Sequence, residues 1–186
     1  MAGNRRSRKS NRRILEKYDS LKYGWLIDAR KFIILIAGVF LVFRLVVGFS
    51  FIKGDSMQPA LKSGEVVMYF RINAGYRAGD VVSVRVPEGK YYVKRVIAAA
   101  GDTIEIKDGN VYLNEEILDE PYIQGRTFVQ EGAVRYPLTL EEDQLFVMGD
   151  NREASMDSRT FGAVGKRQIK GKILLQGGKF YIRKTK

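Results

Sequence analysis

The chain carries hydroxyl and amine side chains suited to hydrolytic chemistry, and its composition limits how they could work. It contains no histidine and no cysteine, so a Ser-His-Asp triad, a thiolate nucleophile and a Cys/His zinc site are all excluded. Disulfide bonds are excluded for the same reason. A serine nucleophile in this chain would need a base other than histidine, and lysine is the remaining candidate.

Ser56 is the candidate nucleophile. It lies in residues 54–59, which read Gly-Asp-Ser-Met-Gln-Pro, a turn-like segment that Pro59 keeps out of a helix. Met57 and Leu61 are apolar and could line a groove beside it. A serine in a turn is most often a solvated surface residue, so the assignment depends on finding a suitable base.

Lys94 is the candidate base. It lies in residues 91–97, Tyr-Tyr-Val-Lys-Arg-Val-Ile, where strand alternation predicts that it shares a face with Tyr92 and Val96. Most strand lysines point to water, where an amine with a pKa near 10.4 is neutral in only about four molecules in ten thousand at pH 7. A lysine base must therefore be desolvated, and apolar neighbours provide that opportunity.

A polar loop, residues 149–162, is the third feature. One interpretation is a solvated surface loop. However, the loop joins two predicted strands, offers hydroxyls at Ser155 and Ser158, and carries Asp157 and Arg159 two residues apart, where they could pair across a bend. Such a loop could orient a catalytic amine.

An apolar run, residues 32–52, precedes these features and is predicted to be a transmembrane anchor. Arg44 is its one charge, and about twenty apolar residues are enough for a helix to cross a bilayer. A cleaved signal peptide would have a shorter leading tail, and a buried core helix would show a polar face that residues 32–43 lack, so an uncleaved anchor is favoured.

The basic charge of the chain is concentrated in the tail, residues 1–31. This tail holds ten Lys or Arg residues against three acidic residues, which leaves only +4 of the net charge of +11 for the rest of the chain. Basic residues before an apolar span predict a cytoplasmic N-terminus and an extracytoplasmic remainder. Because the charge adjoins the apolar run and not a folded basic surface, we expect no nucleic-acid binding.

The remainder is predicted to be mostly β, because short runs rich in Val, Ile, Tyr and Phe alternate with Gly, Asp and Asn. The candidate strands are residues 65–70, 81–86, 91–98, 103–107, 110–113, 145–149, 169–175 and 180–183, with a hairpin turn at Asp108-Gly109. We expect an antiparallel sheet or partial barrel as the catalytic core, formed by residues 53–102 and 143–186. Residues 103–142 are more acidic and polar, which indicates a small inserted β subdomain.

Four motifs, in order along the chain, resemble those of type I signal peptidases. They are residues 54–59, residues 79–82 (Gly-Asp-Val-Val), residues 92–97 with Gly101-Asp102, and residues 149–159, where Gly-Asp-Asn-Arg precedes Ser-Met-Asp-Ser-Arg. The single N-terminal span and the short insertion resemble the Gram-positive form of this family. The similarity covers the chain from the predicted anchor to about residue 165.

The resemblance implies roles for five polar residues. Ser56 would be the nucleophile and Lys94 the general base that takes its proton. Ser155 would hydrogen-bond the lysine amine and fix its direction. Asp157 and Arg159 would hold the loop in shape without taking part in the chemistry.

The resemblance also implies a substrate-binding surface. Met57, Leu61, Tyr92 and Val93 would line shallow pockets for small side chains before the scissile bond, which implies cleavage after Ala-x-Ala-type sites. Some family members have a serine two residues before the nucleophile that helps to hold the oxyanion. Here that position is Gly54, which leaves the backbone N–H of the nucleophile and a neighbouring N–H as the expected donors.

The function implied is that of a membrane-anchored serine endopeptidase of the cell membrane that removes signal peptides from exported precursors through an acyl-enzyme. Its partners would be those signal peptides and the lipid bilayer, and no cofactor or metal is expected. A self-cleaving Ser/Lys protease of the SOS-repressor type is one alternative, which the predicted anchor disfavours. A non-catalytic, membrane-tethered β module that binds exported chains is another, but such a module would be expected to have lost Ser56 or Lys94.

Overall fold

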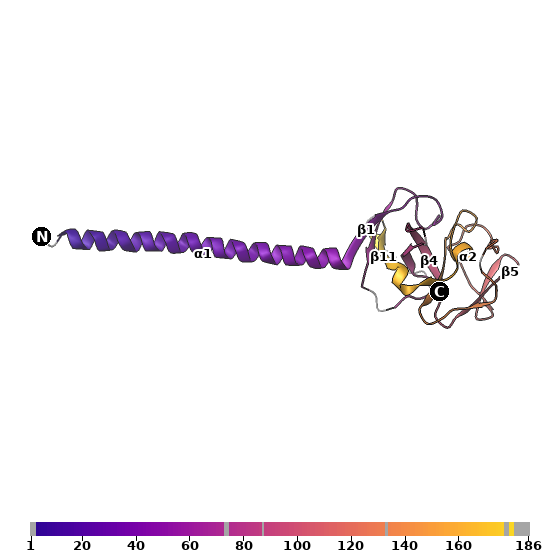
Figure 1. The fold of residues 1–186 in the computed structure, drawn as a ribbon. Helices are drawn as coiled ribbons and strands as arrows, with labels where there is room; N and C mark the ends of the chain where they lie inside the picture. Colours follow the sequence, from indigo (N-terminus) through magenta and orange to yellow (C-terminus); the bar gives the residue numbers. More distant parts are fainter. Residues whose placement is uncertain (1–2, 73–74, 87, 133, 177–178, 181–186) are drawn as a thin grey trace. The chain divides into compact units, whose positions relative to one another are not determined.

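The computed structural model describes residues 3–72, 75–86, 88–132, 134–176 and 179–180. The chain divides into two units, residues 1–45 and residues 46–186. The first unit consists of the helix α1 (Gly3–Val46; Figure 1), whose large apolar side chains between Phe32 and Leu45 are exposed. Within the described residues, no helix is both long enough and apolar enough to cross a membrane.

The helix ends earlier than the sequence predicts, because the last part of the apolar run is a strand. β1 (Val47–Phe51) pairs with β2 (Val66–Phe70) in antiparallel register, with Gly48 opposite Tyr69. A Cβ atom at Gly48 would overlap the Tyr69 ring, so glycine is required for this close pairing. The predicted span of residues 32–52 is therefore divided between α1 and β1, a boundary that an unbroken apolar run does not reveal.

The second unit is built on an antiparallel, curled sheet in the form of a partial barrel, as predicted. The strand order is β1-β2-β11-β3-β4-β9-β10, and β12 pairs with β11. The remaining strands of this sheet are β3 (Val81–Arg85), β4 (Tyr91–Ala99), β9 (Gln144–Met148), β10 (Val164–Gly165), β11 (Ile169–Gln176) and β12 (Lys179–Phe180). Two short helices, α2 (Ser158–Phe161) and the 3-10 helix η1 (Lys166–Gln168), lie between β9 and β11.

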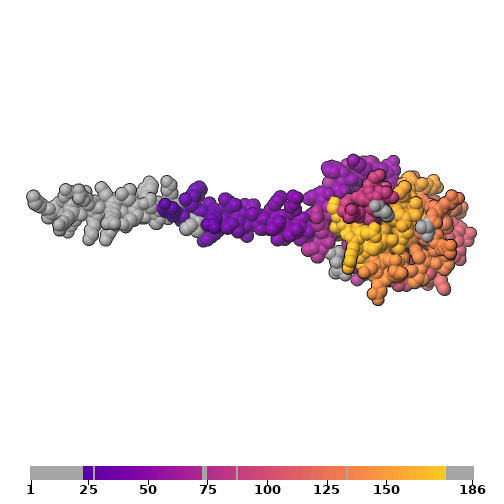
Figure 2. Space-filling model, in the orientation of Figure 1, coloured from indigo at the N-terminus to yellow at the C-terminus, as the bar shows by residue number. Residues whose placement is uncertain are grey.

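Residues 103–139, which we call the insertion, contain the strands of a second, smaller sheet. Its strand order is β7-β6-β5-β8, with β5 (Thr103–Lys107), β6 (Asn110–Leu113), β7 (Glu116–Ile117) and β8 (Leu138–Thr139). Within the second unit, β5 lies far from β1 (Figure 1), and the space-filling view shows the insertion, in pink to orange, away from the violet residues that follow α1 (Figure 2).

Apolar side chains cover both faces of the main sheet. Val81 and Val82 are neighbours in β3, yet Val81 packs with Leu61, Tyr69 and Ile173, whereas Val82 packs in a different cluster. Alternate residues of a strand point to opposite faces, so this division shows that β3 is covered by apolar side chains on both faces. A third apolar cluster joins the main sheet to the insertion.

Most predicted strands match the observed ones to within a residue. The last predicted strand, residues 180–183, coincides with β12 only at Phe180, and its other residues lie outside the described part of the chain. β1, β7, β8 and β10 were not predicted. The last three have two residues each, too few to show a period-2 pattern.

Candidate active site

Ser56 lies in a turn that is anchored to the apolar core by the residues that follow it. Leu61 N–H donates a hydrogen bond of 2.8 Å to the Met57 carbonyl, and both side chains are buried in the apolar cluster under β2. Gly54 has φ +84°, a conformation that side chains with a Cβ rarely adopt. This backbone conformation gives a physical reason for glycine at position 54.

Lys94 contacts Ser56, although the two residues are 38 positions apart in the sequence. Its Nζ lies 2.7 Å from Ser56 Oγ, a hydrogen-bond distance. The amine also lies over the Tyr92 ring, 5.4 Å from its centroid, which confirms that these two residues share a face of β4.

The Lys94 amine is held in a low-dielectric environment, since only 3% of the residue is exposed. Burial lowers the pKa of Lys94 from 10.5 to about 8; the Asp157 and Asp150 carboxylates oppose this shift, and the Arg159 guanidinium adds to it. With a pKa near 8, about a tenth of the amines are neutral at pH 7. A neutral amine at hydrogen-bond distance from a hydroxyl can take its proton.

The Ser155 hydroxyl does not make the hydrogen bond that the resemblance implies. It is buried, and among the described residues it has no hydrogen-bond partner. It lies close to Gly149, where an added Cβ atom would overlap both Ser155 Oγ and the Ser56 carbonyl oxygen. Gly149 thus permits the Ser155 loop and the Ser56 turn to approach each other, but Ser155 is not bonded to Lys94.

Asp157 and Arg159 form a buried ion pair, with Arg159 Nε 2.9 Å from Asp157 Oδ1. The same carboxylate accepts hydrogen bonds from the backbone N–H groups of Gly149 and Arg159, and so caps α2 and ties it to the end of β9. Ser158 Oγ accepts a further bond of 3.0 Å from Val147 N–H. These bonds join the loop to α2 and to β9.

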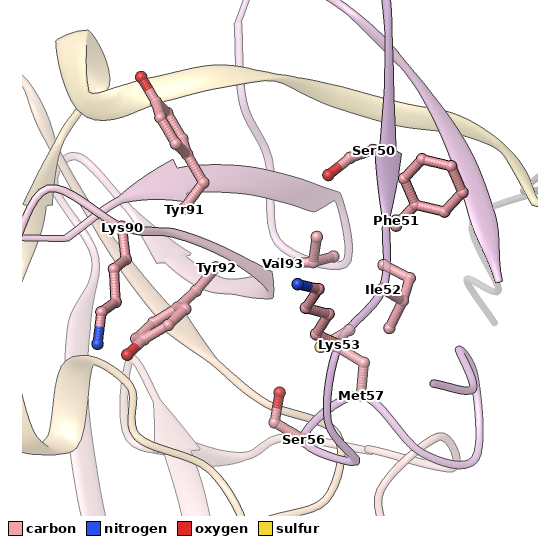
Figure 3. A pocket seen from close by; sticks show the side chains of 10 residues that line it. All are labelled: Ser50, Phe51, Ile52, Lys53, Ser56, Met57, Lys90, Tyr91, Tyr92 and Val93. Carbon is pink, nitrogen blue, oxygen red and sulfur yellow. The ribbon is translucent and has the colours of Figure 1, made fainter. Parts of the chain in front are cut away.

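A groove of about 460 Å³ opens beside Ser56 (Figure 3). One side is formed by residues 50–53 of β1 and the segment after it, the other by residues 90–93 at the start of β4, and the Ser56 hydroxyl points into the space between them. Three of the four predicted substrate-binding residues line it: Met57, Tyr92 and Val93. Leu61 is not among the lining residues, and its side chain is completely buried in the core.

Sequence reasoning missed the β1 side of the groove. In β1, Gly48 is buried, Ser50 is half-buried, and Phe49 and Phe51 are exposed. This alternation appears in the structure, whereas in the sequence β1 only continues the apolar run that precedes it. Among the described residues there is no group of His, Cys, Asp and Glu side chains that could hold a metal ion.

Comparison with known proteins gives consistent matches. The family model described as signal peptidase, peptidase S26, matches residues 26–176. Signal peptidase IB of Staphylococcus aureus strain Mu50 is 36% identical over 167 residues, which cover 80% of this chain and 85% of the relative. Signal peptidase I of Bacillus licheniformis is 35% identical over 131 residues, which cover 64% of this chain and 70% of the relative.

Among solved structures, a signal peptidase I from Enterococcus faecalis V583 matches with a TM-score of 0.43 and 28% sequence identity. The match covers 54% of this chain and 98% of the other.

Proposed function

The chain belongs to the signal peptidase family, peptidase S26, and is accordingly a serine endopeptidase; from this premise we propose that Ser56 is its nucleophile and Lys94 its general base. The observation that carries the proposal is the 2.7 Å contact between Lys94 Nζ and Ser56 Oγ. The burial that lowers the pKa of Lys94 to about 8 supports it, since only the neutral amine can act as a base.

The proposed reaction runs through an acyl-enzyme. Ser56 Oγ attacks the carbonyl carbon of the scissile bond while Lys94 Nζ takes the hydroxyl proton, and the Ser56 backbone N–H donates to the resulting oxyanion. The tetrahedral intermediate collapses, the C–N bond breaks, and Lys94 gives the proton to the leaving amine. Water then attacks the ester with Lys94 again as the base, and Ser56 is regenerated.

The loop residues have supporting roles in this proposal. Asp157 and Arg159 hold the loop against β9, and their charges act on the Lys94 amine in opposite directions. Ser155 lies beside the Ser56 turn, and its hydroxyl, which has no hydrogen-bond partner among the described residues, is available to a bound substrate. None of the three is proposed to form a bond with the reacting carbonyl.

The groove is the proposed site for the residues before the scissile bond. Met57, Tyr92 and Val93 line it, and they are proposed to contact the small side chains of Ala-x-Ala-type sites in the signal peptides of exported precursors. Leu61 supports the floor from below and is not proposed to touch substrate.

We further propose that residues 32–46 attach the protein to the lipid bilayer. Fifteen helical residues extend about 22 Å, less than the ~30 Å hydrocarbon core. Crossing would therefore require Arg30 and Lys31, which precede the segment, and Arg44 within it to snorkel, or the bilayer to thin locally. The basic tail would lie in the cytoplasm and the catalytic unit outside it. If alkaline carbonate released the full chain from membranes, this attachment would be wrong.

The dyad is tested by cleavage of a membrane-inserted precursor that carries an Ala-x-Ala site. Wild type, Ser56→Ala and Lys94→Ala are compared in lipid, with Asp143→Asn as a control because the Asp143 side chain is 82% exposed. Each dyad variant should lose on the order of 10³-fold or more in kcat, and the control should cleave like wild type. Near wild-type turnover by either variant would overturn the assignment.

A further inference from the structure

One segment of the insertion, residues 119–127, contacts the loop that follows β9. Gln124 N–H donates a hydrogen bond of 2.8 Å to the Asp150 carbonyl, and Arg152 N–H donates one of 3.0 Å to the Gln124 carbonyl. These two bonds form an isolated parallel bridge between the insertion and the loop. The backbone of the loop is therefore held from outside the main sheet.

A buried ion pair reinforces this bridge. Arg152 donates from Nη1 to Glu120 Oε2 at 2.8 Å and from Nη2 to Glu120 Oε1 at 2.5 Å, and both side chains are almost completely buried. Arg152 Nε also donates to the Gly149 carbonyl at 3.0 Å. Such a bidentate pair fixes direction as well as distance, so Glu120 determines where the guanidinium meets the loop.

Tyr122 extends the contact toward β4. Its hydroxyl donates to Glu120 Oε1 at 3.0 Å, and its ring lies 4.0 Å from the guanidinium carbon of Arg95. Burial and the neighbouring Glu120 carboxylate raise the pKa of Tyr122, so the hydroxyl stays a donor. Arg95 forms a buried bidentate pair with Asp150, with bonds of 2.7 and 2.6 Å.

The loop held in this way contacts Ser56 directly and is joined to Lys94 through the neighbouring residue in β4. Asn151 N–H donates a hydrogen bond of 3.0 Å to the Ser56 carbonyl, and the partner of Asp150, Arg95, directly follows Lys94 in β4. We propose that Glu120, oriented by Tyr122, is a positioning residue that sets the distance between Ser56 and Lys94. This inference rests on the dyad proposed above and extends it to the insertion.

Neither Glu120 nor Tyr122 lines the groove. A positioning role therefore predicts a loss in kcat with little change in KM, because substrate contacts remain while the attack geometry is disturbed. It also predicts that a looser loop admits water to the Lys94 amine, so that the pH midpoint of activity moves upward toward the ordinary lysine value. A purely structural role would lower thermal stability without moving that midpoint.

The test uses the full-length enzyme in lipid and compares Glu120→Gln with Glu105→Gln. Glu105 lies in β5 of the same insertion, is 38% exposed and pairs with Lys107 at 3.4 Å, so it is a matched surface control. Glu120→Gln should lower kcat by about ten- to a hundredfold, the order of loss expected from a displacement of about 1 Å, with KM within about threefold of wild type. Glu105→Gln should leave kcat, KM and the pH midpoint unchanged.

Two further variants keep the test decisive if Glu120→Gln folds poorly. Tyr122→Phe removes only the hydroxyl that orients Glu120 and should cause a smaller loss of kcat, whereas Glu120→Asp keeps the charge and should recover part of the activity. The proposal is overturned if soluble, folded Glu120→Gln or Tyr122→Phe shows wild-type kcat and pH midpoint. Failure of the dyad itself would appear separately, as activity that persists in Ser56→Ala.

Discussion

The second unit contains two interiors that differ in chemistry. Under the Ser56 turn, Leu61, Val67, Tyr69 and Ile173 form an apolar layer. Behind the loop after β9, the interior is instead made of ion pairs. These pairs are Arg95 with Asp150, Arg152 with Glu120, and Arg159 with Asp157, all with side chains no more than 5% exposed.

The two interiors contribute differently to the site. Apolar burial stabilises the fold in proportion to area and tolerates small shifts. Buried ion pairs contribute little net stability compared with well-packed apolar residues, because the cost of desolvation offsets their attraction. However, such a pair forms only within a small range of distances and orientations. The difference indicates that the apolar layer holds the sheet together while the charged interior fixes the positions of Ser56 and Lys94.

Asp157→Asn, in the charged interior, should have the largest effect on both stability and activity. The substitution removes the charge that pairs with Arg159 and the acceptor geometry that serves Gly149 N–H. Leaving a guanidinium buried without its carboxylate should lower the free energy of unfolding by about 3–5 kcal/mol, and kcat should fall by more than about tenfold. Urea unfolding and turnover of the same preparations measure both, and a loss below ~1 kcal/mol with normal kcat would contradict the role.

Leu61→Ala is the matched variant in the apolar interior, with a smaller expected effect on activity. The cavity should cost about 2–5 kcal/mol of unfolding free energy, while kcat and the preference for small residues should stay within about threefold of wild type, because Leu61 does not reach the groove. A marked change in substrate preference would show that Leu61 lines a substrate pocket after all, as the sequence alone suggested.

Much of the fold could be predicted from the sequence, because most strands are short runs of Val, Ile, Tyr and Phe separated by Gly, Asp and Asn. β5 and β6 were predicted to the residue, with Asp108-Gly109 as their turn. β1 was not, since it continues the apolar run and nothing in that run marks where the helix ends and the strand begins. That boundary is decided by pairing with β2 and by the fit of Gly48 against Tyr69.

The site residues that lie in recognisable motifs could be predicted from the sequence. Those that meet only through the tertiary fold could not. Ser56 and Lys94 were expected to meet and do so. No sequence pattern pointed to Glu120 and Tyr122. The ion pair between Glu120 and Arg152 joins residues 32 positions apart, and such a contact produces no periodicity in the sequence. Leu61 was misplaced because spacing along a turn does not say which side chain points to the groove and which to the core.

The most direct test of the account is the pH dependence of kcat/KM for the wild-type enzyme between pH 6 and 10.5. The free enzyme must have Lys94 neutral, so kcat/KM should rise with pH and reach half its maximum near 8, the pKa that burial gives this amine. A midpoint near 10.5, or a flat profile across this range, would contradict the claim that a desolvated Lys94 activates Ser56.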